Sequence, residues 1–217
     1  MRAIIVLSLL ASSTAFAGDH ELSIGPSTRA LRTDSANALT ESSLDGGLLG
    51  YEHALELGLV PGVQVWATGS FGWGSADGTM FQTLSTSIDT LGFTLGGRAR
   101  YPIWRWLNAT ARLDLGTARA AVALSDAAGH TAADSGWGAV AQGALGVEVV
   151  LLRSRSSRFT LGLRAELGYI AASPVSLTAT PESNSDDDTL QLEMSAASLG
   201  SLNLSGKVFS VSITSQF

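Results

Sequence analysis

Apolar and polar residues alternate with a period of two in segment after segment of this chain. In residues 90–101 the odd positions are Leu, Phe, Leu, Gly, Ala and Tyr, and the even positions are Thr, Gly, Thr, Gly, Arg and Arg. The last nine residues, FSVSITSQF (209–217), repeat the design and end on an aromatic residue. Successive side chains of a strand point to opposite faces, so each segment predicts a β-strand with one apolar and one polar face.

Eight such segments follow one another, and their connections are alternately short and long. The strands are expected at about residues 21–31, 48–59, 63–73, 90–101, 107–115, 136–152, 159–169 and 209–217. Long loops are expected at 32–46, 74–88, 125–135 and in the acidic stretch before the last strand. Segments 175–179 and 190–194 also alternate, which would give ten strands or an extended hairpin above the membrane. The pattern predicts an all-β, antiparallel up-and-down transmembrane β-barrel.

Large aromatic residues gather near the predicted strand ends, where the interfacial girdles of membrane barrels lie. At the loop ends we expect Tyr51, Trp73, Trp137, Tyr169 and Phe209, and at the turn ends Tyr101, Trp104, Trp106, Phe159 and Phe217. A β-sandwich is the main alternative fold, but it would not require aromatic residues at both strand ends. It would also leave the terminal Phe on an unprotected strand edge, which invites pairing with other chains.

Charged residues within the strands lie almost always on the face opposite the apolar one. In a barrel of eight strands that face fills a narrow lumen, where unpaired charges are costly. We therefore predict a salt-bridged plug, and the alternative is a gated path for ions or small solutes. The predicted network is Glu52, Glu56, Arg98, Arg100, Arg112, Asp114, Glu148, Arg164 and Glu166.

The start of the chain predicts export. Residues 1–17 combine a positive start, a short apolar stretch and the small-x-small sequence Ala-Phe-Ala, as in a secretory signal peptide. The expected organisation is a signal peptide over 1–17 and an outer-membrane barrel domain over 18–217. A net charge of −6 argues against nucleic-acid binding, and the absence of Cys excludes disulfides and thiolate metal sites. We expect a monomer without cofactors.

Signs of catalysis or metal binding are weak. His20, His53 and His130 do not stand in a nucleophile motif, so we expect no enzyme, although a lipid-modifying barrel enzyme stays as a further alternative. The acidic run 186–188, with Glu182 nearby, lacks the glycine-punctuated spacing of a calcium loop. We expect a solvated loop tip there, and no metal.

The signal peptide, the eight alternating segments and the FSVSITSQF terminus together resemble the small bacterial outer-membrane barrels of the OmpA/OmpX type. The resemblance covers residues 18–217 and is one of pattern. It implies that Phe217 is the residue recognised by the barrel-assembly machinery, and that outer-membrane lipid and lipopolysaccharide surround the barrel. The expected function is structural or adhesive, exerted through the long loops. A narrow channel or transporter for small or hydrophobic solutes is the alternative.

Overall fold

The computed structural model describes residues 19–31, 36, 39–40, 43–57, 60–80, 84–125, 131–154, 159–181 and 197–217. The predicted signal peptide therefore lies outside the described residues. Strands make up almost all of the described chain, as the alternation predicted. They are β1 (His20–Leu31), β2 (Leu44–Leu55), β3 (Gln64–Met80), β4 (Leu84–Trp104), β5 (Leu107–Ser125), β6 (Thr131–Arg153), β7 (Thr160–Ala172), β8 (Val175–Pro181), β9 (Ala197–Leu202) and β10 (Gly206–Gln216).

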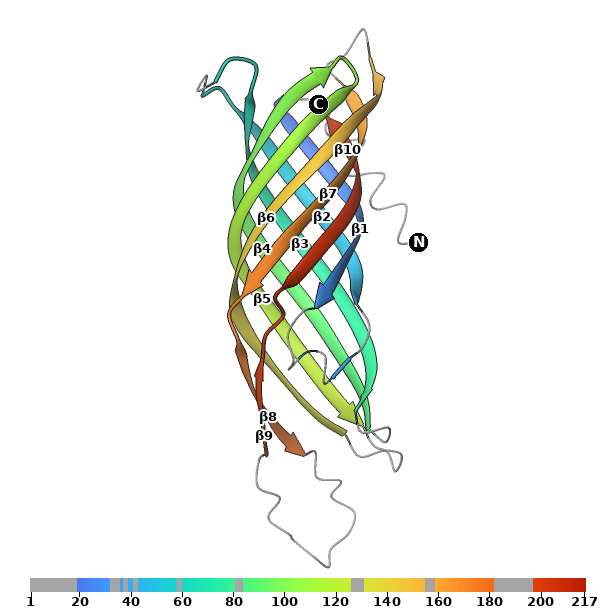
Figure 1. Ribbon diagram of the computed structural model, residues 1–217, viewed down its shortest axis with the longest axis vertical. Helices are drawn as coiled ribbons and strands as arrows, with labels where there is room; N and C mark the ends of the chain where they lie inside the picture. The colour runs from blue at the N-terminus through green and yellow to red at the C-terminus, as the bar shows by residue number, and fades with distance from the viewer. Residues whose placement is uncertain are drawn as a thin grey trace, which may run out of the picture.

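Eight of these strands close into a ring (Figure 1). Strands β1 to β7 each pair antiparallel with the next, and β10 pairs with both β7 and β1. The C-terminal strand is therefore the closing strand, with Gln216 opposite Glu21 and Gly206 opposite Leu31. Closure gives every strand of the ring two neighbours. The predicted antiparallel up-and-down barrel is confirmed.

Strands β8 and β9 form a hairpin outside the ring. They pair with each other, and β8 also pairs with β6 through Thr180 and Pro181. In Figure 1 the hairpin extends beyond the end of the barrel opposite the C-terminus. The predicted segment 175–179 is thus a strand of an extended hairpin, whereas segment 190–194 lies outside the described residues.

The prediction of a loop over residues 74–88 was wrong. Strand β3 continues to Met80 and β4 begins at Leu84, with unbroken pairing from Trp73–Leu91 to Met80–Leu84. Strands β5 and β6 likewise pair through most of the predicted loop at 125–135, up to Ser125 opposite Thr131. These strands were missed because the apolar and polar faces change places there: outward positions such as Ser75 and Asp77 are polar, while the inward Ile88 is buried and apolar. The predicted strands followed only an apolar outer face, which ends with the membrane-spanning region. Backbone pairing continues beyond that region, since Ser and Thr tolerate a strand in water.

The turns at the other end of the barrel are tight. Between β2 and β3, the backbone N–H of Val63 donates to the carbonyl of Val60 at 3.1 Å. Gly62 has a φ of 80°, a conformation that glycine adopts without steric strain. The sequence Val-Pro-Gly at 60–62 is typical of such a turn.

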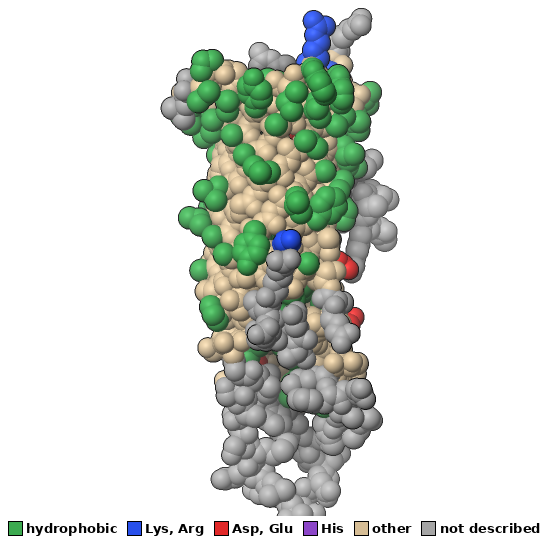
Figure 2. Space-filling view, viewed as in Figure 1, with side chains coloured by type: hydrophobic (Ala, Val, Ile, Leu, Met, Phe, Trp, Pro, Cys, Tyr) green, Lys and Arg blue, Asp and Glu red, His purple; other side chains and the backbone are tan. Residues whose placement is uncertain are grey.

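The barrel is apolar outside and polar inside. Leu95, Leu113 and Leu145 are 73, 68 and 70% exposed, and they point away from the lumen. Figure 2 shows hydrophobic side chains spread over the outer wall. In the part of the chain that the structure describes, no helix has the length and apolar character to cross a bilayer. An exposed leucine surface of this kind is stable in lipid and costly in water.

Candidate functional site

The lumen near the turn end of the barrel holds a network of buried charges. Strand alternation directs them inward: β4 contributes two arginines, β5 an arginine and an aspartate, and β7 an arginine and a glutamate. Single glutamates come from β1, β2 and β6. We call this set the charged network: Glu21, Glu52, Arg98, Arg100, Arg112, Asp114, Glu148, Arg164 and Glu166.

Arg164 is the centre of the charged network. Its Nη1 donates to Glu52 at 2.8 Å, and its Nη2 donates to Glu148 at 2.6 Å. Its Nε also donates to Glu148, at 3.0 Å, and Nη2 contacts Glu21 as well. Glu148 lies on the neighbouring strand, directly opposite Arg164. Glu52 lies on β2, three strands away around the ring, so this guanidinium braces the barrel across its lumen.

The two arginines of β4 make further bonds across the lumen. Arg98 donates to both oxygens of Glu166, at 2.9 and 3.1 Å, and pairs with Glu52. Arg100 pairs with Glu21 at 2.5 Å and with Glu148 at 3.0 Å. Because a carboxylate such as Glu52 or Glu148 contacts two guanidiniums, each buried charge has an opposite charge beside it, and a buried ion pair is stable only under that condition.

The part of the charged network that lies nearer the loop end is built on β5. Arg112 pairs with Asp114, and its Nη2 donates to the hydroxyl of Ser70 at 2.7 Å. The hydroxyl of Thr68 donates to Asp114 at 2.6 Å. The guanidinium of Arg100 also lies 4.7 Å from the ring centroid of the buried Trp66, in a cation–π arrangement.

The structure brings together eight of the nine predicted residues. Glu56 is the exception: β2 ends at Leu55, and Glu56 lies beyond it with an exposed side chain. The prediction for Glu56 was wrong because the strand was extended too far, to residue 59. Glu21 was missed, although Leu22 and Ile24 face outward and alternation already placed Glu21 on the inner face.

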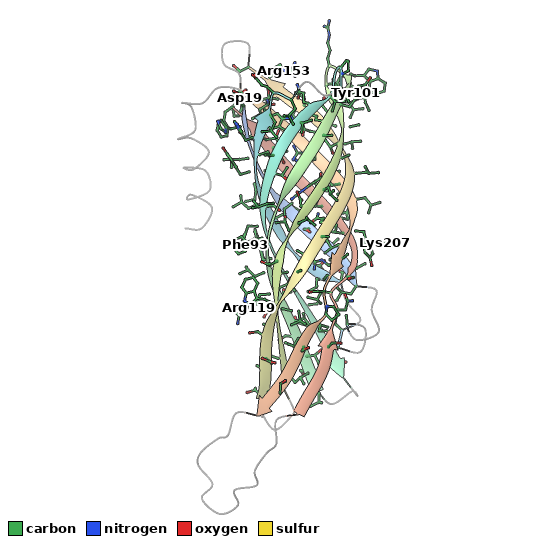
Figure 3. All side chains as sticks on the ribbon, turned by 90° about the vertical axis from the view of Figure 1, so that its left-hand side faces the viewer. Asp19, Phe93, Tyr101, Arg119, Arg153 and Lys207 are labelled. Carbon is green, nitrogen blue, oxygen red and sulfur yellow. The ribbon has the colours of Figure 1, made fainter. Side chains whose placement is uncertain are left out.

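Exposed aromatic side chains lie at both ends of the apolar belt, and Figure 3 shows Tyr101 at the turn end. Trp73, Trp137, Tyr169 and Phe209 are exposed on the loop side, and Tyr101, Trp104, Trp106 and Phe159 are exposed on the turn side. On one wall, Phe159 and Tyr169 mark the two edges ten positions apart. A tilted strand needs about 9–11 residues to cross the hydrocarbon core.

Tyr51 belongs to the turn side, so its predicted place at the loop end was wrong. Its hydroxyl lies 2.6 Å from Nδ1 of His20, and the two rings stack at 5.8 Å. His20 stacks in turn on His53 at 4.8 Å and on Phe217 at 6.2 Å. Backbone bonds of 2.9 and 3.2 Å also join Phe217 to His20, so the last residue is paired with the first strand. His130 and the acidic residues 182 and 186–188 lie outside the described residues.

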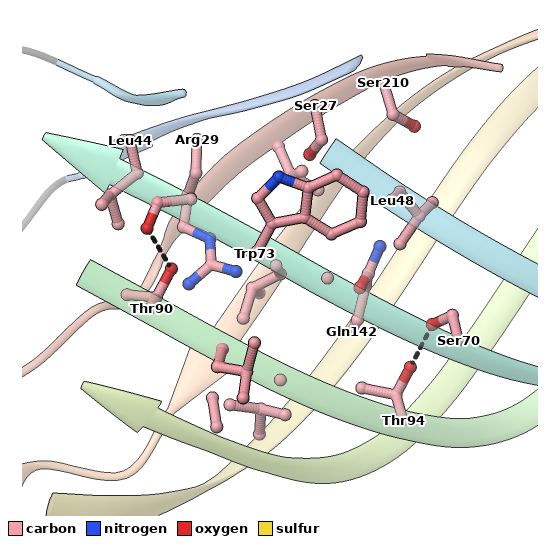
Figure 4. A pocket seen from close by; sticks show the side chains of 18 of the residues that line it. Ser27, Arg29, Leu44, Leu48, Ser70, Trp73, Thr90, Thr94, Gln142 and Ser210 are labelled. Atoms are coloured by element: carbon pink, nitrogen blue, oxygen red, sulfur yellow. Dashed lines mark hydrogen bonds between the residues drawn. The ribbon is translucent and has the colours of Figure 1, made fainter. Parts of the chain in front are cut away.

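The lumen changes character toward the loop end. Along the inner face of β4, the charged Arg100 and Arg98 are followed by small or hydroxyl-bearing residues and then by Ile88. The intervening residues are Gly96, Thr94, Gly92 and Thr90. Ile88 is fully buried in a group that we call the apolar cluster: Ala36, Leu44, Ala76, Ile88, Ala120, Val122, Val175, Leu177, Leu202 and Leu204. Between the charged network and the apolar cluster lies a cavity of about 70 Å³ (Figure 4). Arg29 lines this cavity, and sequence reasoning did not single it out.

A closed antiparallel ring of eight strands, an apolar outer belt between two aromatic girdles and a charged lumen together define a transmembrane β-barrel. The architecture is that of the small outer-membrane barrels of the OmpA/OmpX type.

No family model matches the sequence, and no curated protein matches it. Among solved structures, the chain is similar to Ail, the attachment invasion locus protein of Yersinia pestis. The crystal structure of Ail with the heparin analogue sucrose octasulfate shares 13% identity, with a TM-score of 0.47 over 93% of this chain and 98% of Ail. Ail in a phospholipid bilayer nanodisc gives 12% identity and a TM-score of 0.40, over 92 and 99% of the two chains. The assignment of the barrel rests on the strand pairing of this chain, not on these values.

Proposed function

We propose that the protein is an outer-membrane barrel with a closed lumen and a structural or adhesive role, exerted through its loop end. The observation that carries the proposal is the cross-lumen pairing of the charged network. Four arginines and five carboxylates, all buried, occupy the narrow interior of an eight-stranded ring. Each arginine is paired with at least one carboxylate, which supports a fixed plug.

The extended strands support a role at the loop end. Strand β3 continues seven residues beyond Trp73, and β6 begins six residues before Trp137. At about 3.3 Å per residue along the strand, these strands extend up to about 20 Å past the girdle. The β8–β9 hairpin is attached to the same end. A paired, stiff platform of this kind suits contact with lipopolysaccharide or another cell surface.

The remaining parts of the proposal concern assembly and partners. We propose export directed by residues 1–17, insertion by the barrel-assembly machinery acting on Phe217, and a monomeric barrel in lipid without catalytic activity. The carboxylates of the charged network, which are its candidate acids or bases, are engaged in ion pairs with arginines. This supports a structural role.

Planar-bilayer recording tests the closed lumen. We expect no sustained conductance from the folded chain, and steady, large current steps would contradict the plug.

Binding of barrel-expressing cells to host cells tests adhesion. Replacing residues 182–196 by a short Gly-Ser linker, which keeps Val175, Leu177 and Leu202 in the apolar cluster, should lower binding without changing the amount of folded barrel. Unchanged binding would leave a structural role.

A narrow channel is the second candidate. A cavity of about 550 Å³ opens at the turn end, and its lining includes Arg100 and Glu148 of the charged network. This cavity would admit water and ions to the base of the network from that side, as a channel requires. The same recording separates the two candidates.

A further inference from the structure

The cavity between the charged network and the apolar cluster exists because inward positions carry no side chains. On the inner face, Gly72 is the next position after Ser70 on β3, and Gly92 lies between Thr90 and Thr94 on β4. A Cβ at Gly72 would meet no atom closer than 3.8 Å, and one at Gly92 none closer than 3.5 Å. A Cβ would therefore fit at either position, so close packing against a neighbouring atom does not explain the glycines. A space of about 70 Å³ remains among these inward positions.

Arg29 is the one charged side chain among the residues that line this cavity. It lies on the inner face of β1, opposite Leu44 and Val208. Its Nε and Nη1 are buried and have no hydrogen-bond partner among the described residues. The buried carboxylates of the charged network pair with Arg98, Arg100, Arg112 and Arg164 instead. A guanidinium without a counter-charge in such a site is unfavourable.

The other polar groups of the cavity are neutral hydroxyls and an amide. Ser27, Ser210 and Gln142 line it together with Ser70 and Thr94 (Figure 4). Ser70 and Thr94 share a hydrogen bond of 2.7 Å, and Ser70 also accepts from Arg112, which joins the cavity to the charged network. Hydroxyls and amides donate hydrogen bonds readily, and a guanidinium beside them adds positive charge.

We propose that this cavity is a binding site for one small monovalent anion, held by Arg29. The chemical class is a halide or a carboxylate the size of formate. The volume suits an ion of this size, since a single water needs at least about 10–15 Å³ on the same scale. One guanidinium balances one negative charge, so a divalent anion would leave a buried charge uncompensated. The site is distinct from the proposed plug, and it holds whether or not the lumen conducts.

Bromide is the probe for the test, because its anomalous scattering locates it in a crystal. We expect an anomalous peak within hydrogen-bond distance of the Arg29 guanidinium in crystals of the folded barrel grown with bromide. Arg29→Met should abolish the peak. Arg119→Met is the matched control, because Arg119 faces outward and contacts Ser135. Gly72→Val keeps the arginine and fills the cavity, so it should also abolish the peak.

Thermal unfolding in detergent tests bromide binding at Arg29 in solution. At constant ionic strength, exchanging gluconate for bromide should raise the unfolding midpoint of the wild type and of Arg119→Met. It should leave the midpoints of Arg29→Met and Gly72→Val unchanged. Arg29→Lys should keep the effect with affinity reduced more than about tenfold, since it loses the paired donors of the guanidinium.

Two results would overturn the proposal. One is a wild-type crystal in saturating bromide with peaks on the outer surface alone. The other is a bromide effect on the unfolding midpoint that survives in both Arg29→Met and Gly72→Val. The wild-type crystal alone can contradict the proposal, so the test does not depend on whether each variant folds.

Discussion

The turn-side half and the loop-side half of the lumen are both filled by side chains, but the first is charged and the second is apolar. Near the turns, the interior is filled by nine buried charges that pair with one another across the ring. Near the loops, it is filled by small and branched apolar residues, some of which come from the β8–β9 hairpin. The first half connects distant strands through directional bonds, and the second packs by shape alone. The comparison teaches that alternation fixes which residues face inward, while the depth along the barrel decides what those residues are.

Removing the centre of the charged network should have the largest effect. Arg164→Met leaves Glu21, Glu52 and Glu148 close together with fewer counter-charges. We expect the free energy of unfolding to fall by about 3–5 kcal/mol. Urea unfolding in lipid vesicles measures it, with Arg119→Met as the outward-facing control. A loss below about 1 kcal/mol would mean that the network does not stabilise the barrel.

Truncation in the apolar cluster should cost somewhat less. Ile88 is fully buried there. Ile88→Ala should lower the free energy of unfolding by about 2–5 kcal/mol, and Ile88→Val by about 0.5–1.5 kcal/mol. The same urea titration applies. Equal effects of the two substitutions would show that the loop-side half is not closely packed.

Assembly provides a third comparison, between a charged and an aromatic residue at the end of the last strand. Phe217→Asp should lower the amount of barrel in the outer membrane several-fold without changing export, because the proposed recognition residue is lost. Phe217→Tyr keeps the aromatic ring and should restore most of it. Quantification of heat-modifiable barrel in membrane fractions checks both. Normal levels of the aspartate variant would remove Phe217 as the recognition residue.

The smallest expected effect concerns the attachment of β8 at the loop end. Asp134 accepts bonds from the backbone N–H of Thr178 at 2.5 Å and of Ser135 at 2.7 Å, and these bonds lower the pKa of its exposed carboxyl below the usual 3.8. A lowered pKa in the folded state means that the attachment is complete above pH 3.8 and is lost as the pH falls through the folded pKa.

Amide exchange at Thr178 measures this attachment. Protection relative to an amide in the barrel wall should fall below about pH 4. Asp134→Asn should weaken protection at neutral pH while the wall amides keep theirs. If the protection of the Thr178 amide relative to a wall amide does not change with pH, Asp134 does not hold the hairpin.

Much of the fold was predictable because the bilayer imposes a strict rule on alternation. Residues such as Leu95 and Arg98 could be assigned to opposite faces from their parity alone, and the pairing of β10 with β1 followed from closure. Where the chain leaves the membrane, the rule no longer applies, so the extensions of β3 to Met80 and of β4 from Leu84 were missed. Glu56 failed for a related reason: parity says nothing about where a strand ends.

The partners within the lumen could not be predicted from the sequence. Parity placed Arg98 and Glu166 inside, but their contact depends on the register and stagger of the ring, which bring residues 68 positions apart together. The cavity beside Arg29 depends in the same way on the register that places Gly72 opposite Gly92 on neighbouring strands. These features follow from three-dimensional closure and not from any local pattern.

A double-mutant cycle on Arg98 and Glu166 tests the central claim most directly. The two side chains are buried, joined by bonds of 2.9 and 3.1 Å, and separated by two strands of the ring. Unfolding free energies of the wild type, Arg98→Met, Glu166→Gln and the double variant in lipid vesicles give their coupling energy. If paired charges brace the lumen, the coupling should be about 2 kcal/mol or more. Additive effects, with a coupling near zero, would contradict the account.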